Sequence, residues 1–583
     1  MSLGRLWRTA RHLGAEQLAY QIERRARRRM IRAFPNIARR RIERRAAALP
    51  LPNLDAAPLN AIAESASLAQ GDTGDDLKVG RFTLMNRTFE FGAPDKIDWR
   101  GDFGDGDNPL RRLTLSYMGA AVPALATGNA LEATANMLVT LERDNAWDIP
   151  GVLRDVWNPY GASHRLINLL AGLVLHRRAG GPTGTDAEIA ILAHVRFCAA
   201  FVRTNLERDL QFNHLMKNLV ALAAYGAGTE RLPDSFAFLR DAVPRSVNQC
   251  VLADGGHVER SPMYHKLALI DLRLLQQSGL FGGTLDDAIA RMETALAAMC
   301  HADGDIALFN DSWLGEGPAA STMIDTASVG DVATLPDSGY VRLGGDGDVV
   351  LFDCGSCGPD ETPAHAHADF LSIEASVAGK RLIVDPGVPT YTASPERHFT
   401  RSAAAHNGPA AEGVEPLELW GSFRVGRRTR AEAVDNPALD GFAPLWCAGR
   451  LDADTGHAMS RFVGLWPGLA LCVCDTWSDK PSGARSTFLV TGDWDLTEGD
   501  SPIFSWDTTR VRVDAIVGEV LSVGSANHWL RFDVEQPAHE IVVQPDTRGD
   551  RCQTALWWTW GSTAEPPGSE ELNALLGFLA DTI

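Results

Sequence analysis

The hydrophobic period of this chain changes once, and that change limits the folds that the chain can adopt. Between residues 108 and 300, apolar side chains recur at three- and four-residue spacing, which predicts helices separated by short Gly, Pro and Asp joints. Antiparallel helices of this length form either an α-solenoid or an α/α toroid, and we favour the toroid because no fixed-period repeat is visible. The predicted helices are residues 110–125, 131–143, 164–177, 187–206, 214–226, 234–247, 264–278 and 285–300, preceded by a short hairpin at 82–91.

Beyond about residue 325 the chain consists of short β-rich runs bounded by Gly, Asp and Pro. No helical period separates these runs, so they predict an antiparallel β-sandwich rather than alternating strands and helices. The predicted strands are residues 349–353, 369–377, 380–384, 417–424, 461–474, 486–491, 509–513, 529–534 and 555–560.

A chain of 583 residues is too long for a single hydrophobic core. We therefore predict an α+β multidomain protein, with an N-terminal α/α toroid (an incomplete helical barrel) followed by a C-terminal antiparallel β-sandwich. The predicted parts are an Arg-rich amphipathic helical arm at residues 1–49, a linker rich in Ala, Pro, Gly and Asp at 50–78, the toroid at 79–325 and the β-sandwich at 326–583.

One segment of the β-rich part concentrates polar side chains that carry chemistry. It begins Ala-His-Ala-His-Ala-Asp, so that His365, His367 and Asp369 occupy alternate positions. On a strand these three side chains would share one face. Two imidazoles and a carboxylate together suit either a divalent metal or a proton transfer. The alternative is a polar strand end with solvated histidines, which Asp385 and His406 further along the segment disfavour.

Two segments of the helical part carry more polar side chains than packing requires. Asn213 and His214 stand directly before an apolar helix, where Asn213 also fits as an ordinary N-cap. The second segment runs Asp-Gly-Gly-His-Val-Glu-Arg-Ser-Pro-Met-Tyr-His, with Ser261 suited to cap the next helix. Capping does not explain His257 or Tyr264, so we interpret this segment as the rim of a cleft.

The β-rich segment resembles the C-terminal domain of the heparinase II/III-like polysaccharide lyases. The family pattern is a His-x-His-x-Asp strand, an Asp-Pro-Gly turn followed by Tyr, and an Arg-Ser…Ala-His-Asn close. The matching residues here are His365, His367, Asp369, Asp385, Tyr391, Arg401, His406 and Asn407. Ala403 and Gly408 stand where the family usually has Thr. We expect the Thr hydroxyls of the family to have a supporting rather than a catalytic role.

The helical segments resemble the helical domain of the same family and of related alginate lyases. There an Asn-His pair opens one helix and a Glu-x-Ser-x-x-Tyr-His string opens another. The segment from Trp157 to Arg165 also resembles a family string that lines the cleft. These matches follow the family order between about residues 155 and 410. The resemblance therefore implies two domains with one cleft between them, with Asn213 and Tyr264 on one wall and His365 on the other.

The resemblance implies a lyase that cleaves a uronic-acid polysaccharide by β-elimination and leaves 4,5-unsaturated uronate ends. A base removes the C5 proton, and donors to the substrate carboxylate stabilise the developing enolate. Asn213 and His214 would be those donors, whereas Tyr264 and His365 would transfer protons, provided that the surroundings of Tyr264 lower a pKa normally near about 10. The implied substrate-binding residues are Arg165, Glu259, His257, Tyr391 and Arg401.

The metal ligands that the resemblance implies are His367, Asp385 and His406, with Asp369 as the nearest competitor. Imidazole and carboxylate ligands suit zinc or another divalent ion. We expect the metal to be structural and to lie at the domain junction.

The charge of the chain is distributed unevenly. The first fifty residues hold fourteen Arg and three Glu without Lys or Asp, although the whole chain has a formal net charge of −19. The apolar residues Leu6, Trp7, Leu13, Leu18, Ile22, Ile31 and Phe34 follow a rough helical stripe, which predicts a basic amphipathic arm. The arm either docks on the acidic body or binds an anionic membrane or polysaccharide surface, and we do not expect nucleic acid as a partner.

The sequence also leaves other functional classes and the cellular compartment of the protein open. A non-catalytic polysaccharide-binding or assembly protein on the lyase fold is one alternative, and a metal-dependent hydrolase or a glycosidase using Asp303 and Asp305 is another. The nine cysteines, an odd number, argue against a disulfide framework. We see no transmembrane run or secretory signal, which predicts a cytoplasmic protein, whereas the resemblance implies the cell envelope or periplasm. The expected partner is the acidic polysaccharide substrate, and whether the chain forms a homodimer is left open.

Overall fold

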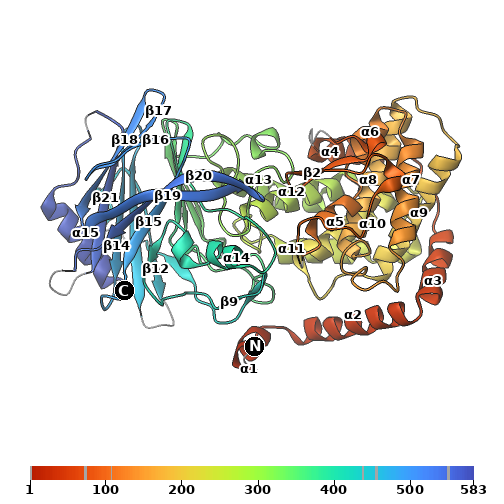
Figure 1. The fold of residues 1–583 in the computed structure, drawn as a ribbon, viewed down its shortest axis with the longest axis horizontal. Helices are drawn as coiled ribbons and strands as arrows, with labels where there is room; N and C mark the ends of the chain where they lie inside the picture. The colour runs from red at the N-terminus through yellow and green to blue at the C-terminus, as the bar shows by residue number, and fades with distance from the viewer. Residues whose placement is uncertain are drawn as a thin grey trace. The chain divides into compact units, whose positions relative to one another are not determined.

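The computed structural model describes residues 3–70, 75–106, 108–435, 439–452, 457–547, 552–562 and 564–583 (Figure 1). The chain divides into two compact units. Leu13–Val251 and Leu267–Ala290 form a helical unit, and Met1–His12, Leu252–Lys266 and Arg291–Ile583 form a β-rich unit. The helical and β-rich parts that the sequence predicts are therefore present, although the predicted boundary near residue 325 falls inside the β-rich unit. None of the described helices combines the length and apolar character needed to cross a bilayer.

The helical unit is built around α8 (Pro159–Arg178), which is buried on almost every side and packs against α4, α6, α9 and α10. Its other described elements are α2 (Ala15–Ala33), α3 (Pro35–Ala47), α4 (Ala57–Gln70), β1 (Arg81–Leu84), β2 (Arg87–Glu90), α5 (Leu110–Ser116), α6 (Ala121–Ala126), α7 (Leu131–Asp144), α9 (Asp186–Thr204), α10 (Phe212–Ala227) and α11 (Leu239–Cys250). Two further helices, α12 (Pro262–Gln277) and α13 (Asp286–Ala298), contribute residues to both units.

Two local predictions for this unit are wrong. The predicted linker at 50–78 contains α4, because Leu59, Ile62 and Ala63 recur at helical spacing and become buried, which outweighs the Pro and Gly content; residues 71–74 of that segment lie outside the described part. The predicted helix at 110–125 is divided into α5 and α6, because Met118 adopts a φ of 59° that a continuous helix cannot accommodate.

The β-rich unit is an antiparallel sandwich. Among the described residues, one sheet has eight strands in the order β11-β12-β13-β14-β21-β18-β17-β16, and the other contains the path β19-β20-β15-β7-β6-β5-β4-β3 with β8 paired to β15. Their bounds are β3 (Val332–Leu335), β4 (Tyr340–Gly345), β5 (Asp348–Asp353), β6 (Ile373–Val377), β7 (Lys380–Ile383), β8 (Pro409–Ala410), β11 (Ala431–Ala433), β12 (Leu445–Asp452), β13 (Ala458–Trp466), β14 (Ala470–Trp477), β15 (Arg485–Thr491), β16 (Asp495–Thr497), β17 (Ile503–Trp506), β18 (Thr509–Val517), β19 (Glu519–Arg531), β20 (Val534–Gln544) and β21 (Gln553–Thr559).

The two sheets bury a common apolar core. Phe352 and Ile373 from one sheet meet Val463 and Trp558 from the other. The outer face of the β13–β14–β21 region is covered by the C-terminal helix α15 (Ser569–Asp581). The predicted strand at 461–474 is a hairpin of β13 and β14 instead, because Pro467 and Gly468 (φ 73°) form a turn between them. The sandwich and the helical region confirm the predicted fold class.

Shorter elements complete this unit. Helix α1 (Leu3–Ala10) and the two-stranded pair of β9 (Leu419–Trp420) and β10 (Arg424–Val425) lie together: Arg8 Nε donates to Glu418 Oε2 at 2.7 Å, and Trp420 Nε1 donates to Thr9 Oγ1 at 3.1 Å. A short helix, α14 (Pro395–Thr400), begins at Ser394, whose side chain accepts from Arg397 N.

Asn407 joins the regions of three strands, β6, β7 and β15, in the interior of the sandwich. Its side-chain amide donates to Ile373 O and Val384 O, each at 2.9 Å, and its side-chain oxygen accepts from Leu489 N at 2.7 Å. The residue is fully buried. Because all of these groups are removed from water, the asparagine in the Ala-His-Asn motif is a structural residue of the sandwich.

Replacing Asn407 by Asp should destabilise the β-rich unit by about 3 kcal/mol or more, because a carboxylate cannot donate to two buried carbonyls and is itself costly to bury. The shift of the denaturant midpoint measures this effect. Asn36→Asp, the same chemical change at an exposed position of α3, is the matched control and should be nearly silent. Equal midpoints for the two variants would contradict the structural role of Asn407.

Candidate active site

A buried carboxylate, Asp311, organises the candidate site in the β-rich unit. Its Oδ2 lies 3.0 Å from His365 Nδ1, and its Oδ1 lies 3.0 Å from His367 Nε2. Arg397 contacts both oxygens, at 2.5 Å to Oδ1 and 2.8 Å to Oδ2. Burial by itself would raise the pKa of Asp311, but Arg397 and the two histidines hold that pKa well below its usual range. Asp311 is therefore ionised and can only accept hydrogen bonds.

The charge of Asp311 fixes the tautomers of both histidines. Because the carboxylate only accepts, each ring must carry a proton on the nitrogen that faces Asp311. His365 then keeps a lone pair on Nε2, and His367 keeps one on Nδ1. Burial lowers the pKa of His367 to about 3, so that this ring is neutral. One carboxylate thus leaves two imidazole lone pairs available for other partners.

Tyr264 lies against His365. The two rings stack with their centroids 3.9 Å apart, and the Tyr264 hydroxyl lies 3.4 Å from the hydroxyl of Tyr391. Tyr264 and His365 are partly exposed, whereas Tyr391 is buried with the Arg397 guanidinium 4.9 Å above its ring. Burial, the neighbouring Tyr391 and the Asp311 carboxylate raise the pKa of Tyr264 well above its usual value. The condition set for proton transfer by Tyr264, a lowered pKa, is therefore not met, and the resting hydroxyl is protonated.

The segment before Tyr264 belongs to the β-rich unit, which corrects the predicted placement of Tyr264 and His365 on opposite domains. Ser261 Oγ donates to the backbone oxygen of Asp311 at 2.8 Å, and Arg260 donates to Gly358 O at 3.2 Å. These bonds tie the start of α12 to the loop that carries Asp311 and to the loop of Gly358. The short distance between Tyr264 and His365 is therefore set within one unit.

The His-x-His-x-Asp segment is not a strand, although we predicted one. The strand β6 begins only at Ile373, because the backbone before it bonds to loops instead: His367 N donates to Asn310 Oδ1 at 2.9 Å, and Ala368 N donates to Arg401 O at 2.9 Å. Asp369 Oδ2 in turn accepts from Asn310 N at 2.6 Å. Both histidines still converge, but on Asp311 rather than through strand alternation.

The group predicted to bind metal is closely spaced. His367, Asp385 and His406 are buried, and one ligand atom from each lies within 4.8 Å of the others. His406 Nδ1 donates to Asp385 Oδ2 at 2.7 Å. Burial opposes charge on His406, but Asp385 outweighs this and raises the pKa of His406. Asp369 does not belong to this group, since it bonds to the backbone of Asn310.

The unpartnered ring nitrogens of this group fit a divalent ion. In the described part of the chain, His367 Nδ1 and His406 Nε2 are buried ring nitrogens without a hydrogen-bond partner. A buried polar atom without a partner is costly, and a cation would satisfy both nitrogens. Two imidazoles and a carboxylate are also the donor types that zinc prefers. Metal binding itself stays a prediction.

Two arginines predicted to bind substrate have internal roles instead. Arg401 is buried and donates to Ala366 O at 2.9 Å and to Ser422 O at 3.1 Å, so that it holds the loop of His365 in place. Arg165 is buried in the helical unit, where its guanidinium lies 4.8 Å over the Trp157 ring. Neither side chain is accessible to a polysaccharide in this structure.

Asn213 and His214 lie in the first turn of α10 in the helical unit. The N-cap is Gln211, with a φ of 59°, and Phe212 follows with a φ of 33°. The interpretation of Asn213 as an ordinary N-cap is therefore wrong. Two consecutive non-glycine residues with positive φ mark local backbone strain, which is common at functional sites. His214 is half-buried, with Nδ1 3.4 Å from the buried Glu207 carboxylate.

His257 and Glu259 lie next to each other in the β-rich unit, with 3.8 Å between His257 Nδ1 and Glu259 Oε2. Burial, together with His265 and His365, lowers the pKa of His257 to about 3. Both side chains are almost fully buried, and their contact with substrate stays a prediction.

Asp311 and its partner Arg397 are site residues that the sequence motifs did not predict. The available signal was the Asn-Asp-Ser triplet between Phe309 and Trp313, a polar run enclosed by aromatic residues. Such flanks indicate that the polar side chains are buried and hence in need of specific partners. The partners themselves come from distant parts of the chain.

Comparison with known proteins supports the same family as these motifs. Residues 328–558 match the family model described as heparinase II/III-like, C-terminal. A crystal structure of heparinase III is similar with a TM-score of 0.65 at 13% sequence identity, over 91% of this chain and 92% of that chain. A mutant of the heparan sulfate lyase HepC from Pedobacter heparinus gives a TM-score of 0.56 at 15% identity, over 87% and 88%.

The fold is thus that of the heparinase-type polysaccharide lyases. Residues 328–558 thus belong to the family described as heparinase II/III-like, C-terminal. Among curated proteins, FtsZ-localized protein C of Caulobacter vibrioides is 30% identical over 393 residues. The match covers 63% of this chain and 65% of that relative, so that the chain spans about two thirds of the relative's length.

Protein purified without chelator is expected to carry about one divalent ion per chain, most of which is lost in His406→Ala because one of three protein ligands is removed. Elemental analysis of both proteins measures this. His398→Ala, which removes an exposed histidine of α14, should keep the metal content of the parent chain. Absence of stoichiometric metal from the parent protein would contradict the assignment.

Proposed function

We propose that this protein is a polysaccharide lyase that cleaves a uronic-acid polysaccharide by β-elimination. The observation that carries the proposal is the stacked pair of Tyr264 and His365, with Asp311 hydrogen-bonded to the far side of the imidazole. An acid and a base in contact, one of them oriented by a buried carboxylate, are what this elimination requires.

His365 is the proposed base. The lone pair on Nε2 takes the C5 proton of the uronate, and the electrons of the broken C–H bond form the C4–C5 double bond. Asp311 keeps the proton on Nδ1 and stabilises the imidazolium that results, as carboxylates do behind catalytic histidines. Arg397 keeps Asp311 ionised throughout.

Tyr264 is the proposed acid. Its raised pKa means that the hydroxyl carries a proton at the start of the reaction and can give it to O4 as the C4–O4 bond breaks. The Tyr391 hydroxyl, 3.4 Å away, can donate to the phenolate that remains. The two proton transfers then balance: one proton moves from C5 to His365 and another from Tyr264 to the leaving sugar.

A divalent ion held by His367, Asp385 and His406 would supply positive charge that fixes these loops without entering a bond-making step. The residues near it act through position. His367 donates to Asp311 from Nε2, so that the same ring that offers Nδ1 to the ion also helps to orient the carboxylate behind His365.

The role of Asn213 and His214 as donors to the substrate carboxylate stays a prediction. The support for this assignment is the Asn-His pair at the start of α10, which resembles the family motif, and the positive φ values that precede Asn213. An amide suits the task because it donates without titrating.

A binding or assembly role is the second candidate, and the name of the Caulobacter relative, FtsZ-localized protein C, favours it. The arrangement of Tyr264, His365 and Asp311 favours the lyase, because a passive binding protein has no need for an oriented imidazole. A glycosidase based on Asp303 is disfavoured, since Arg381 holds that carboxylate in a bidentate ion pair at 2.7 and 3.1 Å.

Replacing Tyr264 by Phe should reduce turnover by a factor of roughly 10² to 10⁴, the usual contribution of a positioned acid or base. Folding stability should change by no more than about 1 kcal/mol, because only a partly solvated hydroxyl is lost. Turnover is measured on a panel of uronate polysaccharides by the ultraviolet absorbance of the unsaturated product.

Tyr20→Phe, the same change on α2, is the matched control and should retain the parent rate. A Tyr264→Phe variant that keeps more than about a tenth of the parent rate would remove Tyr264 from the mechanism and shift the acid role to another group. A parent protein that yields no unsaturated product from any substrate of the panel would favour the binding or assembly role.

A further inference from the structure

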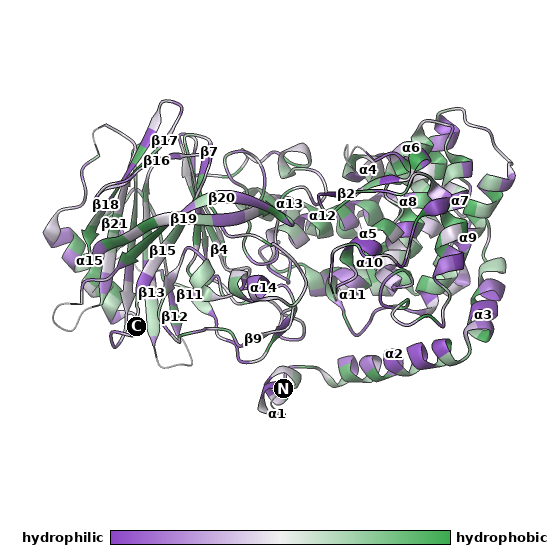
Figure 2. Ribbon diagram, in the orientation of Figure 1, coloured by the Kyte–Doolittle hydropathy of each residue, from purple (hydrophilic) through white to green (hydrophobic). Residues whose placement is uncertain are grey.

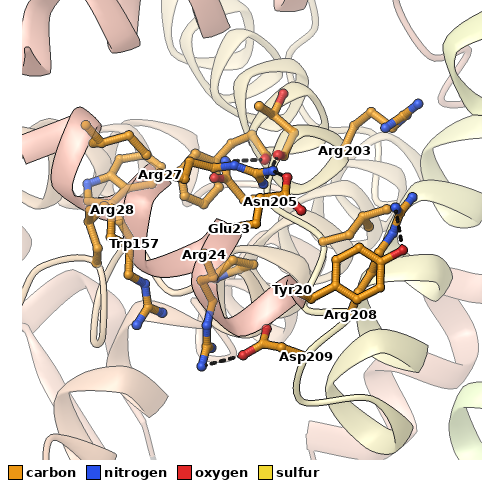
Figure 3. Close-up of a pocket in the computed structure, with 16 residues that line it drawn as sticks. Tyr20, Glu23, Arg24, Arg27, Arg28, Trp157, Arg203, Asn205, Arg208 and Asp209 are labelled. Carbon is orange, nitrogen blue, oxygen red and sulfur yellow. Dashed lines mark hydrogen bonds and ion pairs between the residues drawn. The ribbon is translucent and has the colours of Figure 1, made fainter. Parts of the chain in front are cut away.

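The basic helices α2 and α3 have one face docked on the helical unit. Arg24 lies 2.7 Å from Asp209 Oδ2, and Gln17 Nε2 donates to Asp209 O at 3.1 Å. Figure 3 shows this docked face, where Arg24 points to Asp209 and Tyr20 lies beside Arg208. The docking predicted from the charge of the arm is therefore confirmed for this face.

The docking continues along α3. Ile42 and Ala46 are buried, and Arg39 lies 5.1 Å over the Phe197 ring. Arg196 Nη2 donates to the backbone oxygen of Ala47 at 2.8 Å. These contacts hold α3 on α9, so that the two basic helices are fixed parts of the unit.

The opposite face of α2 is exposed and apolar along part of its length. Leu18, Ile22, Arg25 and Arg29 follow at spacings of four, three and four residues, which places them on one side of the helix, away from Arg24. Ile22 is 66% exposed. Figure 2 shows strongly hydrophilic and hydrophobic residues next to one another along this helix.

The junction between the helices and the start of α3 add further exposed apolar side chains. Met30, Phe34 and Ile37 are 61%, 60% and 68% exposed. They border a groove of about 1190 Å³ whose lining includes the buried side chains of Ile42 and Phe236. Apolar side chains that extend from a groove into solvent are a sign of a partner that is itself apolar.

Arginines without acidic partners surround these apolar side chains. Arg25, Arg29, Arg32, Arg40, Arg41 and Arg44 are all exposed, and within the described ranges none of the six forms an ion pair. The docked face, in contrast, uses its arginines in contacts with Asp209, Glu142 and Thr204. The exposed face therefore combines uncompensated positive charge with exposed hydrocarbon.

We propose that the exposed face of α2 and α3 binds an anionic lipid membrane, with the helices lying in the plane of the interface. Arginine attracts the anionic headgroups, while Ile22, Phe34 and Ile37 enter the acyl boundary, as in other basic amphipathic helices. The helices do not cross the bilayer, because their docked face stays on the protein. This proposal is independent of the proposed lyase activity.

Other partners fit this face less well. A polysaccharide or a nucleic acid would neutralise the arginines but leave Ile22, Phe34 and Ile37 in water. A second copy that presented the same basic face would bring like charges together, which costs association free energy. An anionic lipid surface satisfies both the charge and the apolar side chains.

The proposal is tested by co-sedimentation of the full-length protein with phosphatidylcholine vesicles, with and without phosphatidylglycerol. Binding should require the anionic lipid and weaken as salt increases. The double variant Ile22→Ser with Ile37→Ser should bind at least about tenfold more weakly, because two inserted side chains are lost. Its matched control, Val139→Ser with Ile189→Ser, removes apolar residues that are 62% and 57% exposed on α7 and α9.

A charge variant gives a second, independent measurement. Arg25→Gln with Arg29→Gln should weaken binding by roughly 25-fold, at about fivefold for each arginine near the lipid surface. Arg240→Gln with Arg245→Gln, which changes exposed arginines of α11, is the control and should bind like the parent protein.

Three outcomes would overturn the proposal. The first is equal binding of the parent protein to neutral and anionic vesicles, and the second is vesicle binding by both test variants that equals that of the parent. The third is a dimer, detected by light scattering, that is lost in the Ile22→Ser, Ile37→Ser double variant. Binding to heparin or DNA that depends on the arginines but not on the isoleucines, without vesicle binding, would instead identify a polyanion surface. Because no measurement uses turnover, failure here leaves the lyase proposal standing.

Discussion

A single buried carboxylate carries much of the organisation of this protein. Asp311 is ionised in the interior of the β-rich unit, and it stays so because Arg397, His365 and His367 surround it. Its backbone contributes as well, since its nitrogen donates to His365 O and its oxygen accepts from Ser261. Removing one partner from a buried ion pair typically costs about 3–5 kcal/mol, so these loops depend on one another.

The same carboxylate explains how neighbouring histidines can serve different purposes. It accepts from Nδ1 of His365 and from Nε2 of His367, which leaves opposite nitrogens with lone pairs. In the proposed function, one lone pair removes a proton and the other binds an ion. Tyr264, kept neutral by burial and by Tyr391, then supplies the second proton transfer.

Much of the fold and part of the site follow from local sequence patterns. The helical and strand periods predicted both units, and the His, Asp and His residues expected to bind metal are grouped in the structure. Local patterns failed where two signals competed. At 50–78 the burial of Leu59 and Ile62 outweighed turn-forming residues, and before Ile373 loop hydrogen bonds replaced the expected strand.

The sequence by itself determined that a helical part precedes a β-rich part, and it determined the residue types of the site. Both follow from patterns that extend over only a few residues, namely hydrophobic periodicity and motif spacing. Only the tertiary structure decided which polar groups meet. Asp311 lies 54 positions from His365 and 86 from Arg397, and packing of the sandwich brings them together. The tertiary structure also gave different roles to arginines that the sequence does not distinguish. Arg397 binds Asp311, Arg401 donates to backbone carbonyls, and Arg25 is exposed to solvent. The physical reason is that the free energy of a charged side chain depends on its burial and on its partners, and both are set only when the chain folds.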